Sequence, residues 1–284
     1  MKLNLVEVRE TVKRALAEDI GTGDITTMLT VPATASCRAQ IIAKEEGVIA
    51  GLPVADLVFD GVARSIRTGK VTFAAKVADG DRVRPDEVVA EISGPTGVIL
   101  TAERTALNFL QRMSGIATKT AGLVELVKHT KAQVMDTRKT APGLRVLDKY
   151  AVRVGGGKNH RFGLFDAVLI KDNHIRAAGG VARAVAAVKL GAPHTIKIEV
   201  EADSIEQVKE ALDAGADMIL LDNMKPSELR EAVGLCKGRA LTEASGNVNE
   251  GNIAEIAEAG VDMISVGALT HSVKALDLSL EIIA

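Results

Sequence analysis

The sequence predicts an α/β protein with an N-terminal α/β sandwich followed by an incomplete parallel β/α barrel of six or seven strands. Three observations support this fold class. The first hundred or so residues change quickly between helical and strand patterns. From about residue 101, short apolar runs recur, and each ends in polar residues. Helical patterns fill most of the gaps between these runs, as expected for parallel βα units.

The N-terminal part begins with a predicted helix over residues 5–18, followed by the Gly- and Thr-rich turn EDIGTGDITT. Residues 37–51 then alternate apolar and polar side chains, as a half-buried strand does. Residues 71–95 form short strands joined by turn signals. We expect a domain over residues 1–108, joined by residues 273–284. Residues 71–95 also resemble lipoyl-type carrier domains, but no Lys occupies a matching hairpin tip, so this is a minor alternative.

The predicted barrel covers residues 109–272, and a helical pattern over 101–129 leads into it. The segments AGADMILLDN and AGVDMISVGAL echo each other, as repeated βα units would. In such barrels the chemistry takes place at the carboxyl ends of the strands. The predicted strands lie in residues 133–139, 167–173, 195–201, 218–223, 240–247 and 263–269.

Composition narrows the class of protein. The formal net charge of −2 and aromatic content of 2% argue against general nucleic-acid binding and against base-stacking platforms. Cys37 and Cys236 lie far apart, which suggests reduced thiols rather than a disulfide framework. The N-terminal pattern carries acids throughout, unlike a signal peptide, and no apolar run approaches the ~20 residues that cross a bilayer. We expect a cytoplasmic protein with no membrane or nucleic-acid partner.

Basic residues are concentrated between residues 136 and 161, a feature open to three interpretations. They could form a solvated helix face, a nucleic-acid patch or a pocket for a small anion. Arg138 and Lys139 follow the first barrel strand, and His160, Arg161 and Lys171 could join them. Arg presents a planar fork of donors that matches a carboxylate or phosphate. Together these residues favour a cationic cage for a ligand with more than one anionic group.

Acidic residues follow two of the later strands. Lys197, Glu199 and Glu201 alternate with apolar residues and therefore share one face of a strand. Glu199 could pair with Lys171 or Lys197 in a structural network. Glu201 and Asp222, nearer the mouth, are placed to hold ribose hydroxyls or Mg²⁺-bound water.

Small residues follow the last two strands, in ASGN (244–247) and SVGALTHS (265–272). Gly and small side chains let backbone N–H groups approach a phosphate. Gly155–Gly157 matches neither a dinucleotide nor a triphosphate fingerprint. It could be a flexible loop, or a loop that lays His160 and Arg161 over a ligand. No zinc spacing and no GxSxG motif are present.

Several of these motifs, in this order and spacing, resemble one enzyme family. They are DTRKTAPGLRVLDKYAVRVGGGKNHRFGLFDAVLIKDNHI, KIEVE, LLDN, EASGN and SVGALTHS, together with EDIGTGDITT and TAERTALNFLQRMSGIAT. The family is that of the quinolinate phosphoribosyltransferases, also called nicotinate-nucleotide diphosphorylases (carboxylating). The resemblance implies conversion of quinolinate and 5-phosphoribosyl-1-diphosphate (PRPP) into nicotinate mononucleotide, diphosphate and CO2. It also implies Mg²⁺ as cofactor and a role in NAD biosynthesis.

The resemblance also implies a role for individual residues. Arg138, His160, Arg161 and Lys171 match quinolinate-binding positions. Arg104 matches an arginine that reaches the site of a neighbouring subunit in a homodimer or larger oligomer. The other substrate-binding positions implied are Lys139 near the diphosphate, Glu201 and Asp222 at the ribose and the metal, and Ser245, Gly246 and Gly267 around the 5-phosphate. We also expect Thr137, Asn247 and His271 to belong to the substrate site, with His271 just past the proposed phosphate loop. We expect Lys139, Lys171, Glu201 and Asp222 to be the catalytic residues. Many family members read Ser-Gly-Gly where this chain has Asn247.

Three rival functions remain open on the sequence. One is a phosphoribosyltransferase that uses nicotinate without decarboxylation, although a single carboxylate needs fewer cations. Another is a relative of this fold associated with molybdenum transport. The last is a non-catalytic protein that binds phosphorylated metabolites. Turnover with PRPP distinguishes the enzymes from the binding protein, and the preference between quinolinate and nicotinate distinguishes the first rival.

Overall fold

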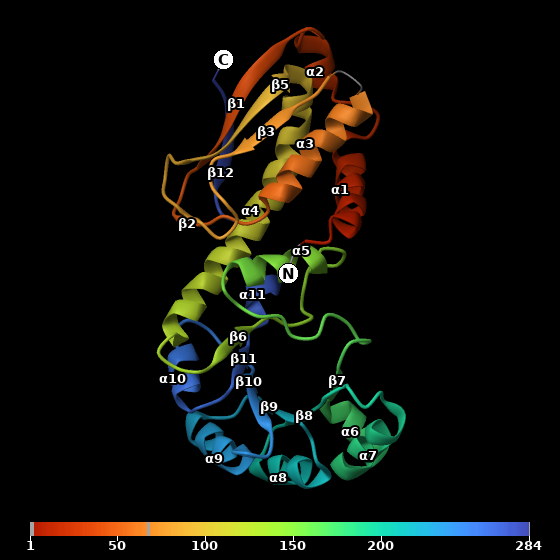
Figure 1. Cartoon of the computed structure of the whole chain (residues 1–284), viewed down its shortest axis with the longest axis vertical. Coiled ribbons are helices and arrows are strands. Elements are labelled where there is room, and N and C mark those ends of the chain that lie inside the picture. The colour runs from red at the N-terminus through yellow and green to blue at the C-terminus, as the bar shows by residue number, and fades with distance from the viewer. Residues whose placement is uncertain (1–2, 67–68, 284) are drawn as a thin grey trace. The chain divides into compact units, whose positions relative to one another are not determined.

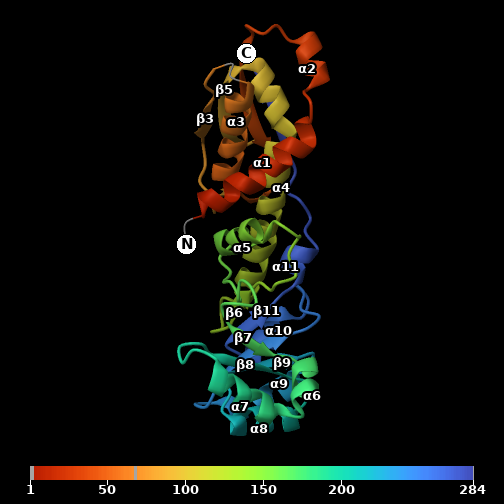
Figure 2. The ribbon, with the colours of Figure 1, turned by 90° about the vertical axis from the view of Figure 1, so that its right-hand side faces the viewer.

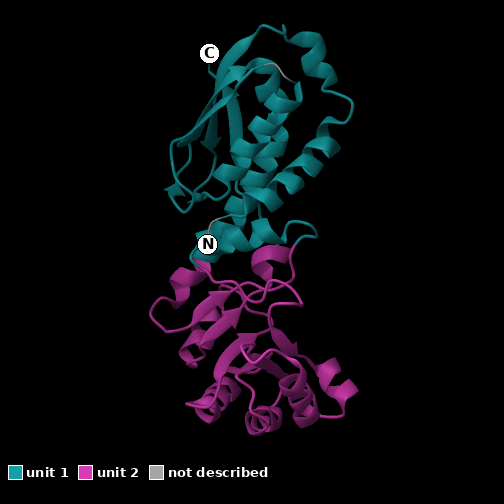
Figure 3. Cartoon of the chain, turned by 45° about the vertical axis from the view of Figure 1, so that its right-hand side comes forward, with its two compact units in different colours: residues 1–121, 141–156, 272–284 teal, residues 122–140, 157–271 magenta. Residues whose placement is uncertain are grey.

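The computed structural model describes residues 3–66 and 69–283, which form two compact units. Unit 1 holds residues 1–121, 141–156 and 272–284, and unit 2 holds residues 122–140 and 157–271 (Figure 3). The sequence places the domain boundary at residue 108, and it places residues 141–156 in the barrel. In the structure, residues 109–121 and 141–156 pack with the N-terminal unit.

Unit 1 is built on a four-stranded antiparallel sheet with the order β12-β1-β5-β3. The central strands are β1 (Ser36–Ala43) and β5 (Val88–Pro95), and the edges are β3 (Thr72–Ala75) and β12 (Leu278–Ile282). Every second residue in the later part of β1 is buried, so one face of the sheet covers the core. Strand β12, near the C-terminus, pairs with β1 in the antiparallel direction. Two short strands, β2 (Gly47–Val48) and β4 (Arg82–Val83), pair separately.

Helices cover one face of this sheet (Figure 1). They are α1 (Leu5–Ile20), α3 (Leu52–Ile66) and the first part of α4 (Thr96–Val127), and the short helix α2 (Ile25–Thr30) lies between α1 and β1 in the chain. Phe59 and Val62 of α3 are fully buried. Asp24 caps α2, because its carboxylate accepts the Thr27 backbone N–H.

Helix α5 (Arg145–Val154) belongs to unit 1 because its polar side chains are held there. The carboxylate of Asp148, which is fully buried, accepts two hydrogen bonds from the guanidinium of Arg112, at 2.9 and 2.8 Å. The Tyr150 hydroxyl donates to Asp79 at 2.8 Å. Arg145, Lys149 and Arg153 lie on this helix, so the basic stretch between residues 136 and 161 is divided between the two units.

Unit 2 contains a six-stranded parallel sheet in the order β6-β11-β10-β9-β8-β7, which confirms the predicted α/β fold class. Its strands are β6 (Gln133–Met135), β7 (Val168–Ile170), β8 (Ile198–Ala202), β9 (Met218–Asp222), β10 (Leu241–Ser245) and β11 (Met263–Ser265). All six fall within the predicted ranges or within one residue of them. Strands β6 and β7 form the two ends of the sheet, so the barrel is incomplete.

The helices of unit 2 pack outside the strands, and α7, α8 and α9 lie side by side (Figures 1 and 2). Because the strands are parallel, their carboxyl ends meet at one edge of the sheet, where the segments after them come together. The helices are α6 (Asp172–Ala178), α7 (Val181–Gly191), α8 (Ile205–Ala214), α9 (Pro226–Cys236), α10 (Ile253–Glu258) and α11 (Ala268–His271). Among the described residues, no helix has the length and apolar character needed to span a membrane.

Candidate active site

A cavity of about 590 Å³ opens at the carboxyl ends of the unit 2 strands. Residues that follow β6, and residues on or directly after β7 to β11, reach it, as the barrel topology predicts. The predicted site residues that line it are Thr137, Arg138, Lys139, His160, Arg161, Lys171, Glu201, Asp222, Ser245, Gly246 and Asn247. Leu169, Leu220, Asn223, Glu243 and Ser265 line it as well.

The remaining predicted site residues lie elsewhere. Gly267 and His271 adjoin Lys139: a Cβ added at Gly267 would lie 3.1 Å from Lys139 Cδ and 3.1 Å from His271 Cδ2. The Thr270 hydroxyl donates to the Lys139 carbonyl at 2.9 Å, which ties these two segments together. Arg104 lies on α4 in unit 1, and its role in a neighbouring subunit stays a prediction.

Two guanidinium groups, those of Arg138 and Arg161, line the cavity together with Lys139 and Lys171. Burial lowers the pKa of Arg161, and the nearby positive charge of Arg138 lowers it further. The Arg161 side chain donates one hydrogen bond, to the Ala167 carbonyl at 3.3 Å. Two like charges held close together in a partly buried place favour an anionic ligand, because an anion offsets their repulsion.

The two acidic residues of β8 have different partners. Glu201 accepts a hydrogen bond from Lys171 Nζ at 2.8 Å. Glu199 does not pair with Lys171 or Lys197, as one interpretation of the sequence had it. Its Oε2 lies 3.1 Å from His160 Nε2, and the Lys197 side chain is exposed ahead of the strand. Glu199 is only 5% exposed and does not itself line the cavity, but it contacts His160, which does.

The segment that carries His160 and Arg161 is anchored by Asp136, which is fully buried after β6. Its carboxylate accepts the His160 backbone N–H at 2.9 Å and the Asn159 side-chain amide at 2.6 Å. Lys158 pairs with Met135 in a parallel bridge. The residues after Gly157 are thus held along the end of β6, which places Arg161 in the cavity.

A chain of amides joins the ends of β9 and β10. Asn247 Nδ2 donates to Asn223 Oδ1, and Asn223 Nδ2 donates to Asp222 Oδ2, both at 3.0 Å. Asn223 and Asn247 both have positive φ, which Asn tolerates better than most residues. Gly246 has φ +99° and leaves no room for a Cβ, which would lie 2.2 Å from Asn223 Oδ1. Asn223 was not among the predicted site residues, although its place directly after a predicted strand was a signal in the sequence.

A buried cluster forms the cavity floor. His160 Nε2 lies 3.6 Å from Glu243 Oε1, in addition to its contact with Glu199. Glu243 is fully buried, and its pKa is raised to about 7, first by burial and second by the charge of Glu199. The sequence showed a carboxylate on a barrel strand here, but only the fold brings it to His160.

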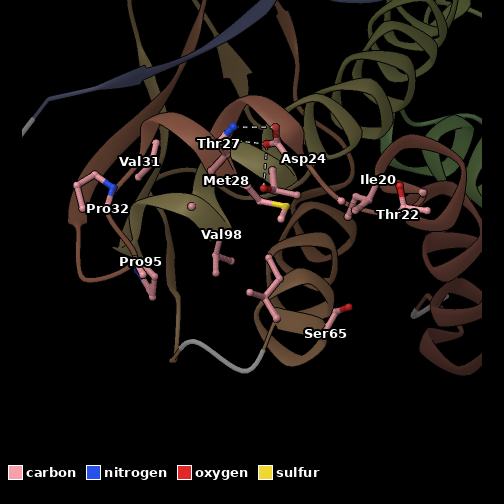
Figure 4. Close-up of a pocket in the computed structure, with 16 residues that line it drawn as sticks. Ile20, Thr22, Asp24, Thr27, Met28, Val31, Pro32, Ser65, Pro95 and Val98 are labelled. Atoms are coloured by element: carbon pink, nitrogen blue, oxygen red, sulfur yellow. Dashed lines mark hydrogen bonds between the residues drawn. The ribbon is translucent and has the colours of Figure 1, made fainter.

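A second cavity, of about 520 Å³, lies in unit 1 between α2, the end of α3 and the start of α4 (Figure 4). Met28, Val31, Pro95 and Val98 are among its lining residues. Its carboxylate, Asp24, accepts hydrogen bonds from the Thr27 N–H and the Thr101 hydroxyl. These bonds account for Asp24 as a helix cap, and among the described lining residues the walls are mainly apolar and no second charged side chain joins Asp24.

Comparisons with known proteins match almost the whole chain to one enzyme family. Residues 24–114 match the family description "Quinolinate phosphoribosyl transferase, N-terminal domain", and residues 116–281 match "Quinolinate phosphoribosyl transferase, C-terminal domain". The chain is 46% identical to the chloroplastic nicotinate-nucleotide pyrophosphorylase (carboxylating) of Arabidopsis thaliana, over 97% of this chain and 83% of that protein.

Solved structures extend the likeness to the fold. The nicotinate-nucleotide pyrophosphorylase from Francisella tularensis superposes with a TM-score of 0.93 at 42% identity, covering 99% of this chain and 98% of that one. Human nicotinic acid phosphoribosyltransferase shares the fold, with a TM-score of 0.67 at 14% identity over 97% of this chain and 74% of that one. The two matching domains and these identities show that the chain belongs to the quinolinate phosphoribosyl transferase family.

Proposed function

We propose that this protein transfers the phosphoribosyl group of PRPP to quinolinate, releasing diphosphate and CO2 and forming nicotinate mononucleotide for NAD biosynthesis. The observation that carries the proposal is the convergence of Arg138, Arg161, Lys139 and Lys171 on one cavity of a chain from this family. Four cationic side chains in one cavity suit two substrates that are both polyanions.

Quinolinate is a planar dicarboxylate, and the two guanidinium groups suit it. Each carboxylate can accept a bidentate pair of hydrogen bonds from an Arg fork. The pKa of Arg161 is lowered first by burial and second by the positive charge of Arg138, so the two guanidinium groups lie close enough to repel each other. A ligand with two carboxylates relieves that repulsion better than a ligand with one, which favours quinolinate over nicotinate.

PRPP fits the other side of the same cavity. The residues Ser245, Gly246 and Asn247 follow β10, and a loop with a Gly at positive φ exposes backbone N–H groups to a phosphate. Lys139, beside Gly267, is available for the diphosphate. Glu201 and Asp222 are the carboxylates at the mouth for the ribose hydroxyls.

Magnesium would be held by Glu201 and Asp222, directly or through water and PRPP. Both side chains line the cavity, and Mg²⁺ prefers one or two carboxylates together with substrate phosphates and water. When bound, the ion would neutralise charge on the departing diphosphate. Lys171, which pairs with Glu201 at 2.8 Å, would keep that carboxylate oriented.

The chain's residues would act by position and charge. Diphosphate leaves C1 of the ribose with oxocarbenium character, and Lys139 stabilises its negative charge. Arg138 and Arg161 hold the quinolinate so that its ring nitrogen faces C1. After the C–N bond forms, the bond between C2 and its carboxylate breaks and CO2 departs. The electron pair stays on C2, where the adjacent positive ring nitrogen stabilises it, and a proton then adds at C2. No covalent bond to the protein is required.

We also propose that the active form is a homodimer or a larger homo-oligomer, with Arg104 contributed to the site of the neighbouring subunit. The family resemblance of TAERTALN supports this assignment. An Arg104→Ala chain mixed with an inactive Lys139→Ala chain should recover part of the activity, because hybrid oligomers hold one intact site. No recovery at any mixing ratio would contradict a shared site.

The decisive experiment is an assay with two pyridine substrates. Purified protein is incubated with PRPP, Mg²⁺ and either quinolinate or nicotinate, and nicotinate mononucleotide is separated and quantified. We expect product from quinolinate, equimolar CO2, and little or none from nicotinate. Product from nicotinate without CO2 would support the non-decarboxylating rival, and binding without any product would support a metabolite-binding protein.

A further inference from the structure

Two buried carboxylates that the reaction scheme does not use lie against His160: Glu243, which lines the cavity, and Glu199, which does not. Glu199 comes from β8 and Glu243 from β10, which are separated in the sheet by β9. In a barrel, alternate strands contribute side chains to one interior layer. Both side chains are almost completely buried, at 5% and 0% exposure. Carboxylates in such a place are costly unless they have a function or a partner.

The partner of both is the ring of His160, and the geometry fixes its tautomer. The Arg161 backbone N–H donates to His160 Nδ1 at 2.7 Å, so Nδ1 carries no proton. The neutral ring therefore has its proton on Nε2, which faces Glu199 Oε2 at 3.1 Å and Glu243 Oε1 at 3.6 Å. The carboxylates thus stabilise the Nε2–H tautomer of His160, in which Nδ1 is free of a proton and accepts the Arg161 N–H.

The same geometry argues against a cation at this place. His160, Glu199 and Glu243 each offer a ligand atom, and these atoms lie within 4.8 Å of one another, as in a metal site. A metal ion on Nε2 would require Nδ1 to carry the proton, because a neutral ring has only one. Nδ1 already accepts the Arg161 N–H, so a proton rather than a metal ion holds this cluster together.

The two carboxylates contact the His160 Nε2–H differently: Glu199 lies at 3.1 Å and Glu243 at 3.6 Å. Among the described residues, neither oxygen of Glu243 and only one of Glu199 has a partner at full hydrogen-bond geometry. Glu243 titrates near pH 7 because burial and the charge of Glu199 raise its pKa; His160 and the neighbouring Ser265 hydroxyl oppose this rise, and Asp136 adds to it. Below that pH, Glu243 is neutral and the pair carries a single negative charge.

We propose that Glu199 and Glu243 are positioning residues: together they hold the His160 ring so that it accepts the Arg161 backbone N–H, and they thereby aim Arg161 at a substrate carboxylate. This proposal rests on the proposed function for the identity of the substrate, quinolinate. Loss of either carboxylate should loosen the ring and the Arg161 backbone. The effect should fall on quinolinate and not on PRPP, because Asp222 and the loop after β10 lie outside the cluster.

The first test measures the His160 ring directly and does not depend on turnover. Nitrogen-15 NMR of the labelled histidines, with His160 assigned through His160→Gln, should show the Nε2–H tautomer in the unaltered protein. Glu199→Leu should convert His160 to mixed tautomers. A predominant Nδ1–H tautomer or an imidazolium at pH 8 in the unaltered protein would overturn the proposal, and so would loss of the His160 Nε2 proton on adding Zn²⁺ alone.

The second test separates the two substrates by kinetics. Glu199→Leu should raise the KM for quinolinate by about tenfold or more, the effect expected on losing a hydrogen bond to a charged group. The KM for PRPP should change less than about twofold. Equal loss for both substrates, or a fall in kcat alone, would overturn the positioning role.

The third test uses the isosteric variant Glu243→Gln, which cannot ionise. In the unaltered protein, the KM for quinolinate should rise above about pH 7, by at most about tenfold per pH unit, as a second negative charge forms on the pair. Glu243→Gln should lose this rise. A variant with the unaltered pH slope but a lower melting temperature would mean that Glu243 is only structural.

Asp262 provides a matched control at the opposite end of the strands. Its carboxylate accepts the Thr242 N–H and hydroxyl, both at 2.9 Å, and it does not line the cavity. Asp262→Asn should lower the melting temperature and keep the pH slope of the quinolinate KM. If the unaltered protein forms no nicotinate mononucleotide at all, the proposed function fails, while the NMR test still decides the arrangement of the cluster.

Discussion

The two cavities of this protein are similar in volume but differ in what their polar groups do. In the unit 1 cavity, the Asp24 carboxylate caps α2 and accepts the Thr101 hydroxyl, and both bonds stabilise the fold. In the unit 2 cavity, cationic side chains from three segments converge, and a buried glutamate titrates near pH 7. A charge whose partners cap a helix and join it to its neighbour has a structural role, whereas charges that converge on one cavity from separate segments indicate a functional site.

The largest expected effect comes from removing one guanidinium of the unit 2 cavity. Arg138→Ala should raise the KM for quinolinate by about 100-fold, since a charge-assisted bidentate contact contributes up to about 3 kcal/mol. The fold should stay intact, as measured by circular dichroism. Arg176→Ala is the control: this residue is exposed on α6 and pairs only with Asp172 among the described ion pairs. Unchanged quinolinate kinetics in Arg138→Ala would disprove its role.

A large effect on the phosphate side should follow from Gly246→Ala. The new Cβ would lie 2.2 Å from Asn223 Oδ1, and the backbone has φ +99°, so the loop after β10 must shift. We expect a rise of more than tenfold in the KM for PRPP and a loss of about 1–3 kcal/mol of stability. Gly234→Ala on α9 is the control; no atom lies within 4 Å of its Cβ, and helix propensity predicts a gain of about 0.5–1 kcal/mol. Normal PRPP kinetics in Gly246→Ala would remove this loop from the phosphate site.

The unit 1 cavity should respond in stability and not in substrate affinity. Asp24→Ala removes the cap of α2 and should cost about 1 kcal/mol in chemical denaturation. The Asp24 pKa is lowered, mainly by its hydrogen bonds to Thr27, so the carboxylate stabilises the fold above its ordinary pKa of 3.8. The deficit of the variant should therefore shrink as the pH falls below 3.8. A deficit that stays constant down to pH 2 would show that the charge contributes nothing.

The smallest effect is expected at Asn247. Asn247→Gly removes the hydrogen bond from the Asn247 side-chain amide to Asn223, which in turn donates to Asp222. It also places a glycine at a backbone position with a positive φ of 51°, which glycine adopts more readily than asparagine. We expect the KM for PRPP to change by about two- to threefold, the equivalent of a weak hydrogen bond. Asn249→Gly, which leaves the Asn223 contact in place, serves as the comparison. A change of tenfold or more in Asn247→Gly would make Asn247 a direct substrate contact.

Sequence periodicity determined the strands and helices of unit 2, because short, mainly apolar runs recur and amphipathic helix patterns fill most of the gaps between them. The rule that chemistry gathers at the carboxyl ends of parallel strands then selected Arg138, Lys171, Glu201 and Asp222 for one cavity. The motifs around residues 136–175 identified the family, and the comparisons confirm it.

Only the tertiary structure decided how the basic stretch is divided. Arg145, Lys149 and Arg153 are close to Arg138 in the sequence, but α5 packs in unit 1, where Asp148 is held by Arg112 and Tyr150 by Asp79. Likewise, sequence patterns showed Glu199 and Glu243 only as carboxylates on strands. Their contact with His160 depends on strand order and on the path of the chain after Gly157, which local side-chain patterns do not encode because such contacts join residues far apart in the chain.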